Sequence, residues 1–495
     1  MIRNSKLKTI AKQCIRSLPN NEYKKNLLYF YEDAAKNRNK WIDKNYYYYS
    51  EHYKYMKYLI PEGMNVLEIG SGTGRLLNHL RPLNGVGIDI SSEMVQISKN
   101  NYPHLNFIEG DIEDESTLLI IKDKFDYIII SDTIGYLIDC QKTFENLQKF
   151  CNKETRIIIS YYSWLWEPAL KFAEKIGQKM PQPQMNWLST DTISNLLYLS
   201  SYKVIKREWR QLCPKKFFGL GTLLNRYIGT LPLIRKICLR NYIVARPILN
   251  SYVQHESLSV SIIIPCRNEE GNIEPAIKRI PEFTSNMEII FVEGNSKDNT
   301  KSEIQRIIRK YPEKDITMLV QDGVGKWDAV RKAFEYANND ILMILDADLT
   351  TPPEELPKFY NVILSGKGEF VNGSRMVYPM ENEAMRLLNF WANSIFSYLF
   401  TWILNQKYTD TLCGTKVLSR KNYENISKRY GEYSVYDPFG DFYLIFGANR
   451  ENLHTVEIPI RYAARGYGET QISRFRHGLV LARMVLLAYR RFKAF

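Results

Sequence analysis

The sequence is short of the features that mark a secreted or membrane-spanning protein. Its seven cysteines are scattered and no pair has the spacing of a metal site, so we expect reduced thiols in a reducing compartment. The first 30 residues contain Lys and Asn throughout and lack an apolar core, so we expect no secretory signal peptide. No stretch reaches the roughly 18 to 20 uncharged apolar residues that span a bilayer.

Acidic residues are absent from two long stretches of a basic chain. The net charge is +13, yet no Asp or Glu lies between Glu208 and Glu256 or after Glu469. Basic charge gathered in this way attracts acidic partners. At 495 residues the chain is also too long for one hydrophobic core, so we expect two or more domains.

Two series of short apolar runs alternate with helical patterns along the chain. A basic segment with helical spacing at residues 1–44 precedes them. The first series occupies residues 45–250 and the second residues 256–495, with a polar linker at residues 248–258. Such alternation is typical of βαβ units that build a largely parallel sheet. We therefore predict an α/β protein of two domains.

A glycine-rich turn follows the first apolar run. Residues 66–74 read VLEIGSGTG, and glycine lets a backbone turn tightly and approach a ligand that a Cβ atom would exclude. Dinucleotide-binding folds use similar glycines, and a tight turn without a ligand can look the same. Asp89 ends the second run, where a carboxylate can accept both ribose hydroxyls. Asp111 and Ile112 follow the third run, where Ile112 can lie on a purine.

Together these residues resemble a class I S-adenosylmethionine-dependent methyltransferase, a Rossmann-like fold, over roughly residues 45–250. The resemblance implies that the glycine loop holds the methionine part of the cofactor and that Asp89 binds its ribose. It also implies that Asp111 binds the adenine amino group and that Ile112 packs on the adenine. The cofactor-binding residues implied in this way are Glu68, Gly70, Gly72, Gly74, Asp89, Asp111 and Ile112.

No motif indicates which atom accepts the methyl group. Residues 131–136 and the aromatic residues at 161–166 follow the fourth and fifth runs, so we expect them to line the acceptor pocket. Methyl transfer from a sulfonium is an in-line displacement for which alignment can suffice. Asp132 is either a base for the acceptor or a helix cap.

Two carboxylates, Asp346 and Asp348, close the apolar run at residues 341–345 in the second series. Carboxylates on alternate residues at a strand end can share a divalent cation that neutralises a diphosphate leaving group. The same spacing also occurs at solvated strand ends without a ligand. The neighbouring motifs favour the metal site: residues 262–270 read IIIPCRNEE, residues 292–300 read VEGNSKDNT and residues 325–329 read GKWDA.

This ordered set resembles family 2 glycosyltransferases with the GT-A nucleotide-sugar-binding fold. The resemblance implies a nucleoside-diphosphate sugar donor, with Mg²⁺ or Mn²⁺ held by Asp346 and Asp348. The residues that it implies for nucleotide-sugar binding are Pro265, Glu269, Glu293, Asp322 and Asp346.

The likeness is greatest to the polyprenol-phosphate branch, such as dolichol-phosphate mannose synthases. Residues 373–375 (Gly-Ser-Arg) and 459–473 carry it, and they imply that Arg375, Arg465 and Arg386 contact phosphate groups. Two positions depart from that branch. Thr350 stands where a Gln metal ligand is usual, and residues 469–473 lack the usual Ser-Lys pair.

Two further acidic segments, residues 410–414 and 437–441, fall where GT-A enzymes place acceptor-side residues. A hydroxyl acceptor needs a general base, for which Asp410 is the candidate. A lipid phosphate is already ionised and needs none, so Asp410 would then only position it.

Three apolar stretches with basic neighbours, residues 215–240, 390–404 and 479–489, suit an anionic membrane surface. Core or inter-domain helices would show the same pattern. Nucleic-acid binding is less favoured because no recognition motif appears.

We therefore expect a cytoplasmic, peripherally membrane-associated enzyme with two activities, namely sugar transfer to a polyprenyl phosphate and methylation of a small molecule or glycan intermediate. One alternative gives the glycosyltransferase a sugar hydroxyl acceptor. Another makes the methyltransferase domain a non-catalytic sensor or docking module. The sequence does not name the sugar, the nucleotide, the methyl acceptor or the oligomeric state.

Overall fold

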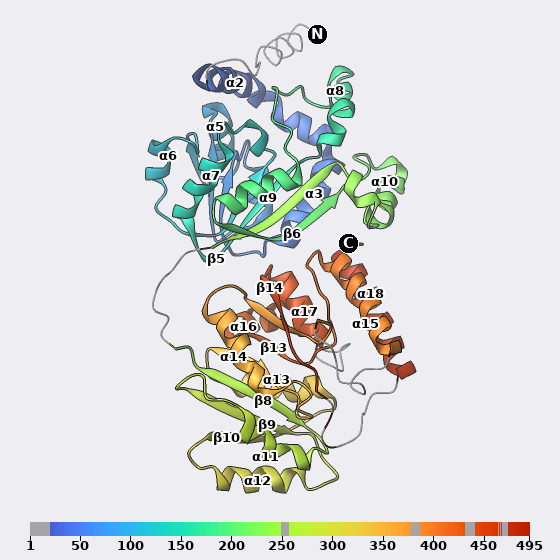
Figure 1. Cartoon of the computed structure of the whole chain (residues 1–495). Helices are drawn as coiled ribbons and strands as arrows, with labels where there is room; N and C mark the ends of the chain where they lie inside the picture. Colours follow the sequence, from blue (N-terminus) through green and yellow to red (C-terminus); the bar gives the residue numbers. More distant parts are fainter. Residues whose placement is uncertain are drawn as a thin grey trace. The chain divides into compact units, whose positions relative to one another are not determined.

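The computed structural model of the chain divides into two compact units, Met1–Asn250 and Ser251–Lys493 (Figure 1). It describes residues 20–248, 257–377, 387–430, 441–463, 465, 467 and 474–495. Each unit holds one mixed sheet covered by helices, so the predicted α/β class is confirmed.

The sheet of unit 1 has the order β3-β2-β1-β4-β5-β7-β6. Strands β1 to β5 are parallel, and β7 runs antiparallel to both of its neighbours. The central strands are apolar on both faces, which suits strands covered by helices on each side. The strands are β1 (Asn65–Ile69), β2 (Asn84–Asp89), β3 (Asn106–Glu109), β4 (Phe125–Ser131), β5 (Cys151–Tyr162), β6 (Tyr202–Arg210) and β7 (Arg240–Pro247).

The helices of unit 1 include the basic N-terminal segment, whose helix α2 (Asn20–Lys44) belongs to this unit. Ser91 and Ser189 cap the helices that follow them by accepting a backbone N–H three residues on. The remaining helices are α3 (Tyr46–Leu59), α4 (Arg75–Leu80), α5 (Ser92–Asn101), α6 (Glu115–Ile120), α7 (Cys140–Leu147), α8 (Glu167–Lys175), α9 (Thr190–Leu199) and α10 (Leu220–Leu223).

The sheet of unit 2 has the order β10-β9-β8-β11-β13-β12-β14. Its first four strands are parallel, so their carboxyl ends meet along one edge. Strand β13 runs antiparallel to β11 and β12, and β14 runs parallel to β12. The strands are β8 (Val260–Cys266), β9 (Met287–Glu293), β10 (Asp315–Val320), β11 (Ile341–Ile344), β12 (Phe370–Ser374), β13 (Lys416–Ser419) and β14 (Thr455–Pro459).

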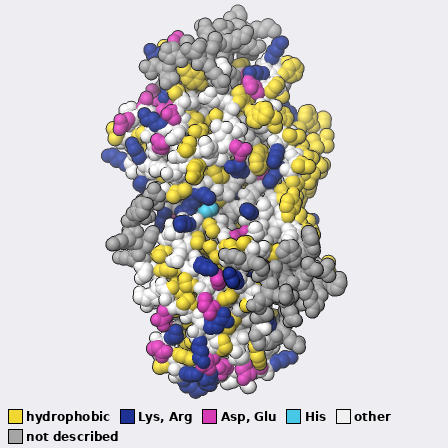
Figure 2. Space-filling model, in the orientation of Figure 1, with side chains coloured by type: hydrophobic (Ala, Val, Ile, Leu, Met, Phe, Trp, Pro, Cys, Tyr) yellow, Lys and Arg dark blue, Asp and Glu magenta, His cyan; other side chains and the backbone are white. Residues whose placement is uncertain are grey.

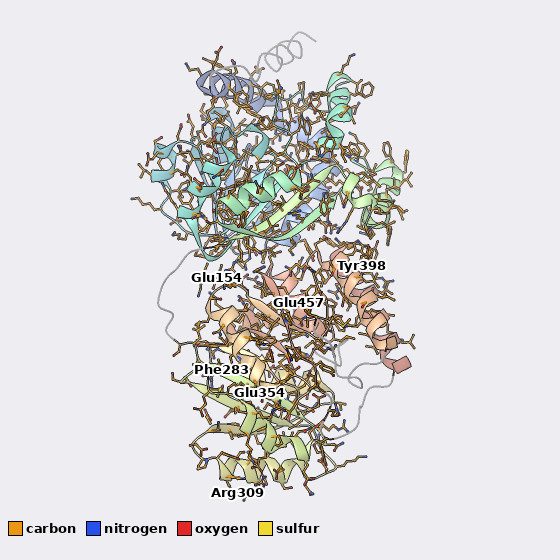
Figure 3. All side chains as sticks on the ribbon, in the orientation of Figure 1. Glu154, Phe283, Arg309, Glu354, Tyr398 and Glu457 are labelled. Atoms are coloured by element: carbon orange, nitrogen blue, oxygen red, sulfur yellow. The ribbon has the colours of Figure 1, made fainter. Side chains whose placement is uncertain are left out.

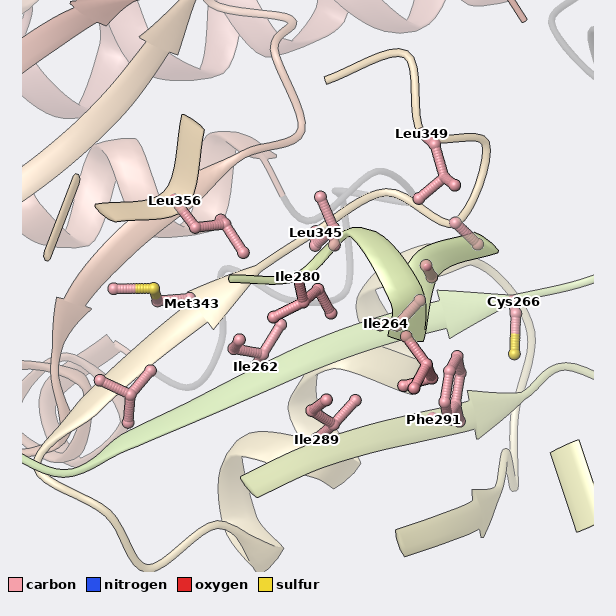
Figure 4. Packing of buried hydrophobic residues seen from close by; sticks show 14 of the residues in the cluster. Ile262, Ile264, Cys266, Ile280, Ile289, Phe291, Met343, Leu345, Leu349 and Leu356 are labelled. Carbon is pink, nitrogen blue, oxygen red and sulfur yellow. The ribbon is translucent and has the colours of Figure 1, made fainter. Parts of the chain in front are cut away.

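Apolar side chains on one face of β8, β9 and β11 form the core of unit 2 (Figure 4). Ile262, Ile264 and Phe291 are fully buried there. Packing of this kind fixes the register of the strands, because a shift by one residue would turn the apolar set to the other face. The helices of unit 2 are α11 (Glu270–Arg279), α12 (Thr300–Lys310), α13 (Lys326–Tyr336), α14 (Leu356–Leu364), α15 (Leu387–Leu404), α16 (Arg420–Tyr430), α17 (Asp441–Arg450) and α18 (Arg474–Phe492).

The sequence left open whether helices α15 and α18 lie at a membrane surface or in a core. In the structure, one part of each helix is packed in the core of unit 2. Phe400 and Met484 are buried, and the rings of Trp402 and Tyr489 lie 5.6 Å apart between the two helices. Leu479 and Ile395 remain exposed. Among the described residues, no helix has the length and apolar character needed to cross a bilayer.

Glu68 lies inside unit 1, in β1, with 3% of its surface exposed. Its Oε2 atom has no hydrogen-bond partner among the described residues. Burial raises the pKa of Glu68 to about 8. A carboxyl group in this environment is stable as the neutral acid.

We predict that the Glu68→Gln variant loses less stability than the parent as pH rises. Between the pKa of the unfolded chain and about 8, the folded parent holds a proton that the unfolded chain releases, so its stability falls by about 1.4 kcal/mol per pH unit. A Gln side chain does not titrate, so the variant lacks this loss of stability. Hydrogen exchange of the β1 amides, corrected for intrinsic rates, should show that the parent loses about 2.5 kcal/mol of stability between pH 5.5 and 7.5 and that the variant does not. Glu115→Gln, which changes an exposed acid, is the control and should show the same pH dependence of stability as the parent. Equal pH dependence in all three proteins would contradict the prediction.

Candidate functional sites

A cavity of about 400 Å³ lies in unit 1, at the carboxyl ends of β1, β2 and β4. The predicted residues Gly70, Gly72, Asp89, Asp111 and Ile112 line it. Helix α2 forms a further part of its wall, which sequence analysis did not predict. The contributions of α2 are Lys24, Lys25, Leu27, Leu28, Tyr31 and Arg38.

The three predicted glycines have different structural reasons for lacking a side chain. All have positive φ, between 53° and 74°. A Cβ atom on Gly70 would lie 2.1 Å from Thr133 Oγ1, and one on Gly74 would lie 2.6 Å from the Phe107 ring. A Cβ on Gly72 would meet nothing within 4 Å, although this residue lines the cavity. Gly72 therefore leaves its backbone open to a ligand.

Asp89 stands at the end of β2 and faces the cavity. Its Oδ2 accepts a hydrogen bond from Gly72 N at 2.7 Å, and its Oδ1 accepts one from Ser91 N at 3.0 Å. Burial raises its pKa, against the effect of these two bonds. Each carboxylate oxygen has a second lone pair, so a ligand hydroxyl can still donate to Asp89.

Asp111 is held by a cation that sequence analysis did not assign. Lys24 of α2 donates to Asp111 Oδ2 and lies 3.1 Å from Glu113 Oε2. Asp111 Oδ1 accepts a hydrogen bond from Glu113 N at 2.9 Å. A ligand amino group at Asp111 must therefore share this carboxylate with Lys24 or displace the ammonium.

Two of the predicted cofactor residues do not line the cavity. Glu68 is buried within the sheet, and Gly74 packs against Phe107. Both shape the loop from behind it. A direct contact of either residue with the cofactor therefore remains a prediction.

Asp132 lies on the cavity wall with a φ of 57°, which a non-glycine residue rarely adopts. Its two oxygens accept from Arg240 Nη1 at 3.0 Å and from Arg240 Nη2 at 2.8 Å. Arg240 is fully buried and also donates to the Tyr48 hydroxyl. Asp132 makes no helix-cap bond, so that alternative is wrong; its role as a base remains a prediction.

A neutral histidine supports the same wall. His52 lies 2.9 Å from Tyr242 Oη and 3.0 Å from Ser131 Oγ through its two ring nitrogens. Burial and the charge of Arg240 hold its pKa well below the usual value. The aromatic residues at 161–166, expected in the acceptor pocket, are not among the cavity-lining residues; Tyr162 instead stacks on Tyr48.

In unit 2 the predicted nucleotide-binding residues lie at the ends of three neighbouring parallel strands. Pro265 lies in β8, Glu293 ends β9 and Asp322 follows β10. Glu293 is buried and accepts a hydrogen bond from Ser296 N at 2.6 Å. The Asp322 side chain is 75% exposed and pairs with Lys332 at 2.7 Å. The sheet thus places these residues on one edge, with Asp322 the most open to solvent.

Asp346 follows β11 on the same edge and pairs with Lys326, the first residue of α13. Lys326 Nζ lies 2.5 Å from Asp346 Oδ1. Although burial alone would raise it, Lys326 holds the pKa of Asp346 below its usual value. Gly414 lies against this pair, since a Cβ there would be 2.1 Å from Asp346 Oδ2.

Asp348 is engaged through both oxygens. Thr350 Oγ1 donates to its Oδ1 at 2.9 Å, and Arg465 Nη2 donates to its Oδ2 at 2.7 Å. Arg465 also lies 3.6 Å from Glu269, which accepts from Asn272 Nδ2 at 2.6 Å. The threonine at position 350 therefore orients Asp348 through its hydroxyl.

Asp410 is fully buried and holds Arg375. Arg375 Nε and Nη2 donate to its two oxygens at 2.6 and 2.8 Å, and Asn393 Nδ2 donates at 3.1 Å. Burial alone would raise the pKa of Asp410, but Arg375 holds it below the usual value. This geometry favours positioning of Arg375 over the predicted role as a general base, because a base needs a free lone pair near the acceptor.

Glu457 of β14 fixes the segment that carries Asp410 (Figure 3). Its carboxylate accepts from Thr409 N at 2.9 Å and from Asp410 N at 3.3 Å. Behind this segment, buried Lys416 lies 3.1 Å from Asp441 Oδ1. Other predicted residues, Arg386 and those at 437–440 and 468–473, lie outside the described residues.

Comparison with known proteins finds one family for each unit. Residues 60–211 match the methyltransferase domain family, and residues 261–427 match glycosyl transferase family 2.

Curated relatives match part of the chain. The dolichol-phosphate mannosyltransferase of Pyrococcus furiosus is 37% identical over 24% of this chain and 34% of the relative. The undecaprenyl-phosphate 4-deoxy-4-formamido-L-arabinose transferase of Photorhabdus laumondii is 28% identical over 43% of this chain and 63% of the relative. The chain thus spans between a third and just under two thirds of the length of these relatives.

Solved structures match each unit separately. A possible histamine N-methyltransferase of Thermotoga maritima aligns with 44% of this chain and 99% of its own, at 16% identity and a TM-score of 0.34. Glucosyl-3-phosphoglycerate synthase of Mycobacterium tuberculosis, in complex with Mn²⁺ and uridine diphosphate, aligns with 48% of this chain and 80% of its own, at 17% identity and a TM-score of 0.35. By the two family matches, the chain carries a methyltransferase domain at residues 60–211 and a glycosyl transferase family 2 domain at residues 261–427.

Proposed function

We propose that the protein is a bifunctional enzyme. Unit 2 transfers a sugar from a nucleoside-diphosphate sugar to a polyprenyl phosphate, with inversion, and unit 1 methylates a small molecule or glycan intermediate with S-adenosylmethionine. The observation that carries the proposal is the edge of unit 2, where Asp346 and Asp348 follow a parallel strand and face Lys326 and Arg465. The match to glycosyl transferase family 2 supports sugar transfer as the reaction at that edge.

The cavity of unit 1 fits S-adenosylmethionine. Gly72 leaves its backbone open to the cavity, and Asp89 can accept from a ligand hydroxyl there. The cofactor, when bound, supplies an electrophilic methyl group. Asp132 and Ser131 stand on the same wall, and the Arg240 and His52 contacts hold them in place. The chain's own part is thus to bind, enclose and align the reactants.

We predict that Asp89→Ala weakens S-adenosylmethionine binding about tenfold or more, because it removes a charge-assisted hydrogen bond of about 1.5 to 3 kcal/mol. Calorimetry on the purified full chain measures this. Glu93→Ala, an exposed acid of the adjacent helix, is the matched control and should bind as the parent does. A parent protein that binds no cofactor at millimolar concentration would instead support the docking-module alternative.

The carboxylate pair of unit 2 fits a divalent cation. Each carboxylate already lies against a positive group of the same chain, Lys326 at Asp346 and Arg465 at Asp348, so the pair is built to face positive charge. Mg²⁺ or Mn²⁺, when bound, neutralises the charge of the diphosphate. Among the described residues no group of three or more acidic, His or Cys side chains gathers as a metal site. We propose that Asp346 and Asp348 are the protein's ligands and that the donor diphosphate supplies others.

We predict that sugar transfer requires a divalent cation and that Asp348→Asn reduces it at least a hundredfold with the fold intact. Asn keeps the bond from Thr350 but loses the charge that attracts the cation. Asp315→Asn, at the opposite end of the strands in β10, is the control for a lost acid. The test is transfer of radiolabelled sugar with and without EDTA; full activity in excess EDTA would refute the prediction.

Arg375 is the proposed contact for the acceptor phosphate. Two of its nitrogens bind Asp410, and its Nη1 makes no hydrogen bond to another described residue, so it can donate to an anion. A phosphate acceptor needs no base, which agrees with the engaged state of Asp410. The alternative, a sugar hydroxyl acceptor, needs a base that this pair does not offer.

We predict that Arg375→Lys raises the KM for a short, soluble polyprenyl phosphate about tenfold with a smaller effect on kcat, since lysine lacks the planar fork. Arg279→Lys, an exposed arginine paired with Glu354, is the control. Steady-state kinetics provide the split between KM and kcat. Mass spectrometry of the products from a panel of acceptors identifies which acceptor is used. Transfer to sugar hydroxyls alone would replace this proposal with the alternative.

A polyprenyl phosphate resides in a membrane, so we propose that the protein works at the cytosolic face of one as a peripheral protein. In unit 2, α18 exposes Leu479 and Leu486 beside Arg483 and Arg490. Apolar and basic groups on one helix suit the interface of an anionic leaflet.

A further inference from the structure

A protrusion of unit 1 exposes an unusual amount of apolar surface. Residues 214–238, between β6 and β7, form short irregular turns around α10 and are named the apolar tip. Six large apolar side chains of the tip are more than half exposed, including Phe218 at 112% and Leu233 at 85%: Phe217, Phe218, Leu220, Leu223, Leu233 and Ile237. Soluble surfaces rarely gather this many.

The structure holds the tip in this conformation. Phe217 and Phe218 have φ of 42° and 54°, the left-handed region that bulky residues avoid. Such strain persists only where neighbouring contacts impose it. Two backbone bonds close the turn around the phenylalanines, because Gly219 N and Gly221 N both donate to Lys216 O, at 2.9 and 3.0 Å. Asn225 ties the base of the tip, since its side chain accepts from Cys213 N at 2.7 Å and donates to Tyr47 Oη at 3.1 Å. The two phenylalanines are therefore presented outward by a fixed frame.

Glycine at position 221 is required by the same frame. A Cβ atom there would lie 1.9 Å from Lys215 O, a backbone atom that cannot move aside without unfolding the turn. At the far end of the tip, Cys238 is buried and Trp166 Nε1 donates to Ile237 O at 2.8 Å. Both ends of the tip are thus tied to the body of unit 1, while its large apolar side chains project.

The charge around the tip is of one sign. No Asp or Glu occurs from residue 209 to residue 255, and Lys216 and Lys236 are exposed within the tip. Figure 2 shows hydrophobic side chains gathered on this side of unit 1, over α10 and α8. Phe172 of α8 is also exposed. The tip itself combines apolar groups with lysines and contains no acid, which complements an anionic bilayer.

We propose that the apolar tip is a membrane-docking element of the methyltransferase unit, which inserts Phe217, Phe218 and Leu233 into an anionic leaflet. Separate protruding side chains with basic neighbours suit a fluid interface, whereas a protein partner requires a shaped complementary surface. The inference rests on the proposed function only for the expectation that the substrates are lipid-borne. It adds a second point of attachment, on the unit that does not transfer sugar.

The test is flotation of the full chain with phosphatidylcholine–phosphatidylglycerol vesicles at low salt, without substrates. Phe217→Ser combined with Phe218→Ser should lower the partition coefficient about tenfold or more, because two apolar anchors are lost. Leu83→Ser combined with Leu119→Ser is the matched control, since both leucines are exposed in unit 1 at 79% and 73% but lie outside the tip. This control should bind as the parent does.

A charge variant separates insertion from attraction. Lys216→Gln combined with Lys236→Gln should weaken binding to anionic vesicles at low salt and have little effect at 1 M salt, where charges are screened. Thermal unfolding confirms that each variant is folded. Binding of the Phe217/Phe218 variant equal to that of the parent would overturn the proposal, as would a parent protein that ignores anionic vesicles at low salt.

The outcomes remain distinct from those of the proposed function. Sugar transfer by the Phe217/Phe218 variant to a short, soluble acceptor should equal that of the parent, because the tip lies outside unit 2. If transfer proves to use only sugar hydroxyls while the tip still controls vesicle binding, the docking inference stands and the proposed acceptor fails.

Discussion

At the ligand-facing edge of each sheet, carboxylates form ion pairs with Lys or Arg residues of the same chain. Asp111 faces Lys24, Asp346 faces Lys326 and Asp348 faces Arg465. Parallel strands bring such acids to one edge, and crowded carboxylates repel each other and lose hydration when partly buried. An internal cation offsets both effects without closing the site, since each of these six side chains keeps between 16% and 27% of its surface exposed. The same acids can therefore receive a cationic or hydrogen-bond-donating ligand when the internal cation turns away.

The pair of Asp132 and Arg240 in unit 1 differs from these because its cation is fully buried. Arg240 is fully buried, so removal of either partner would leave an unpaired charge, at a typical cost of about 3 to 5 kcal/mol. The pair fixes a residue with strained backbone on the cavity wall, next to Ser131, which His52 holds. A rigid wall of this kind favours alignment of an acceptor with the cofactor over acid–base chemistry, and alignment is what an in-line displacement chiefly needs.

Short local patterns in the sequence predicted the fold and the loops. They did not predict ion pairs between residues that are far apart in the sequence. Short apolar runs predict the strands, and glycines predict the tight turn after β1. The parallel sheet of unit 2 places the carboxylates that follow β11 on the same edge as the other strand ends, as expected. The partners did not follow: Lys24 is 87 residues from Asp111, Arg240 is 108 from Asp132 and Arg465 is 117 from Asp348. Nothing in a short window encodes such pairs. A helical spacing of Lys24, Leu27, Tyr31 and Arg38 did mark one face of α2, but it did not indicate what that face covers. For Asp410 the sequence left a base and a positioning role open, and its two bonds from Arg375 favour the positioning role.

The segment from Asp410 to Lys416 joins the acceptor side of unit 2 to its donor side. Asp410 at one end fixes Arg375, and Gly414 near the other lies against Asp346 and Lys326. Lys416 closes the segment through the Cys413 carbonyl and Asp441, with its side chain fully buried. A segment this short with both ends bound has little freedom to move in parts, so the contacts at Asp346 and at Arg375 depend on the same stretch of backbone. In the proposed function, this segment of seven residues therefore links the residue that contacts the acceptor phosphate to the residues that face the donor.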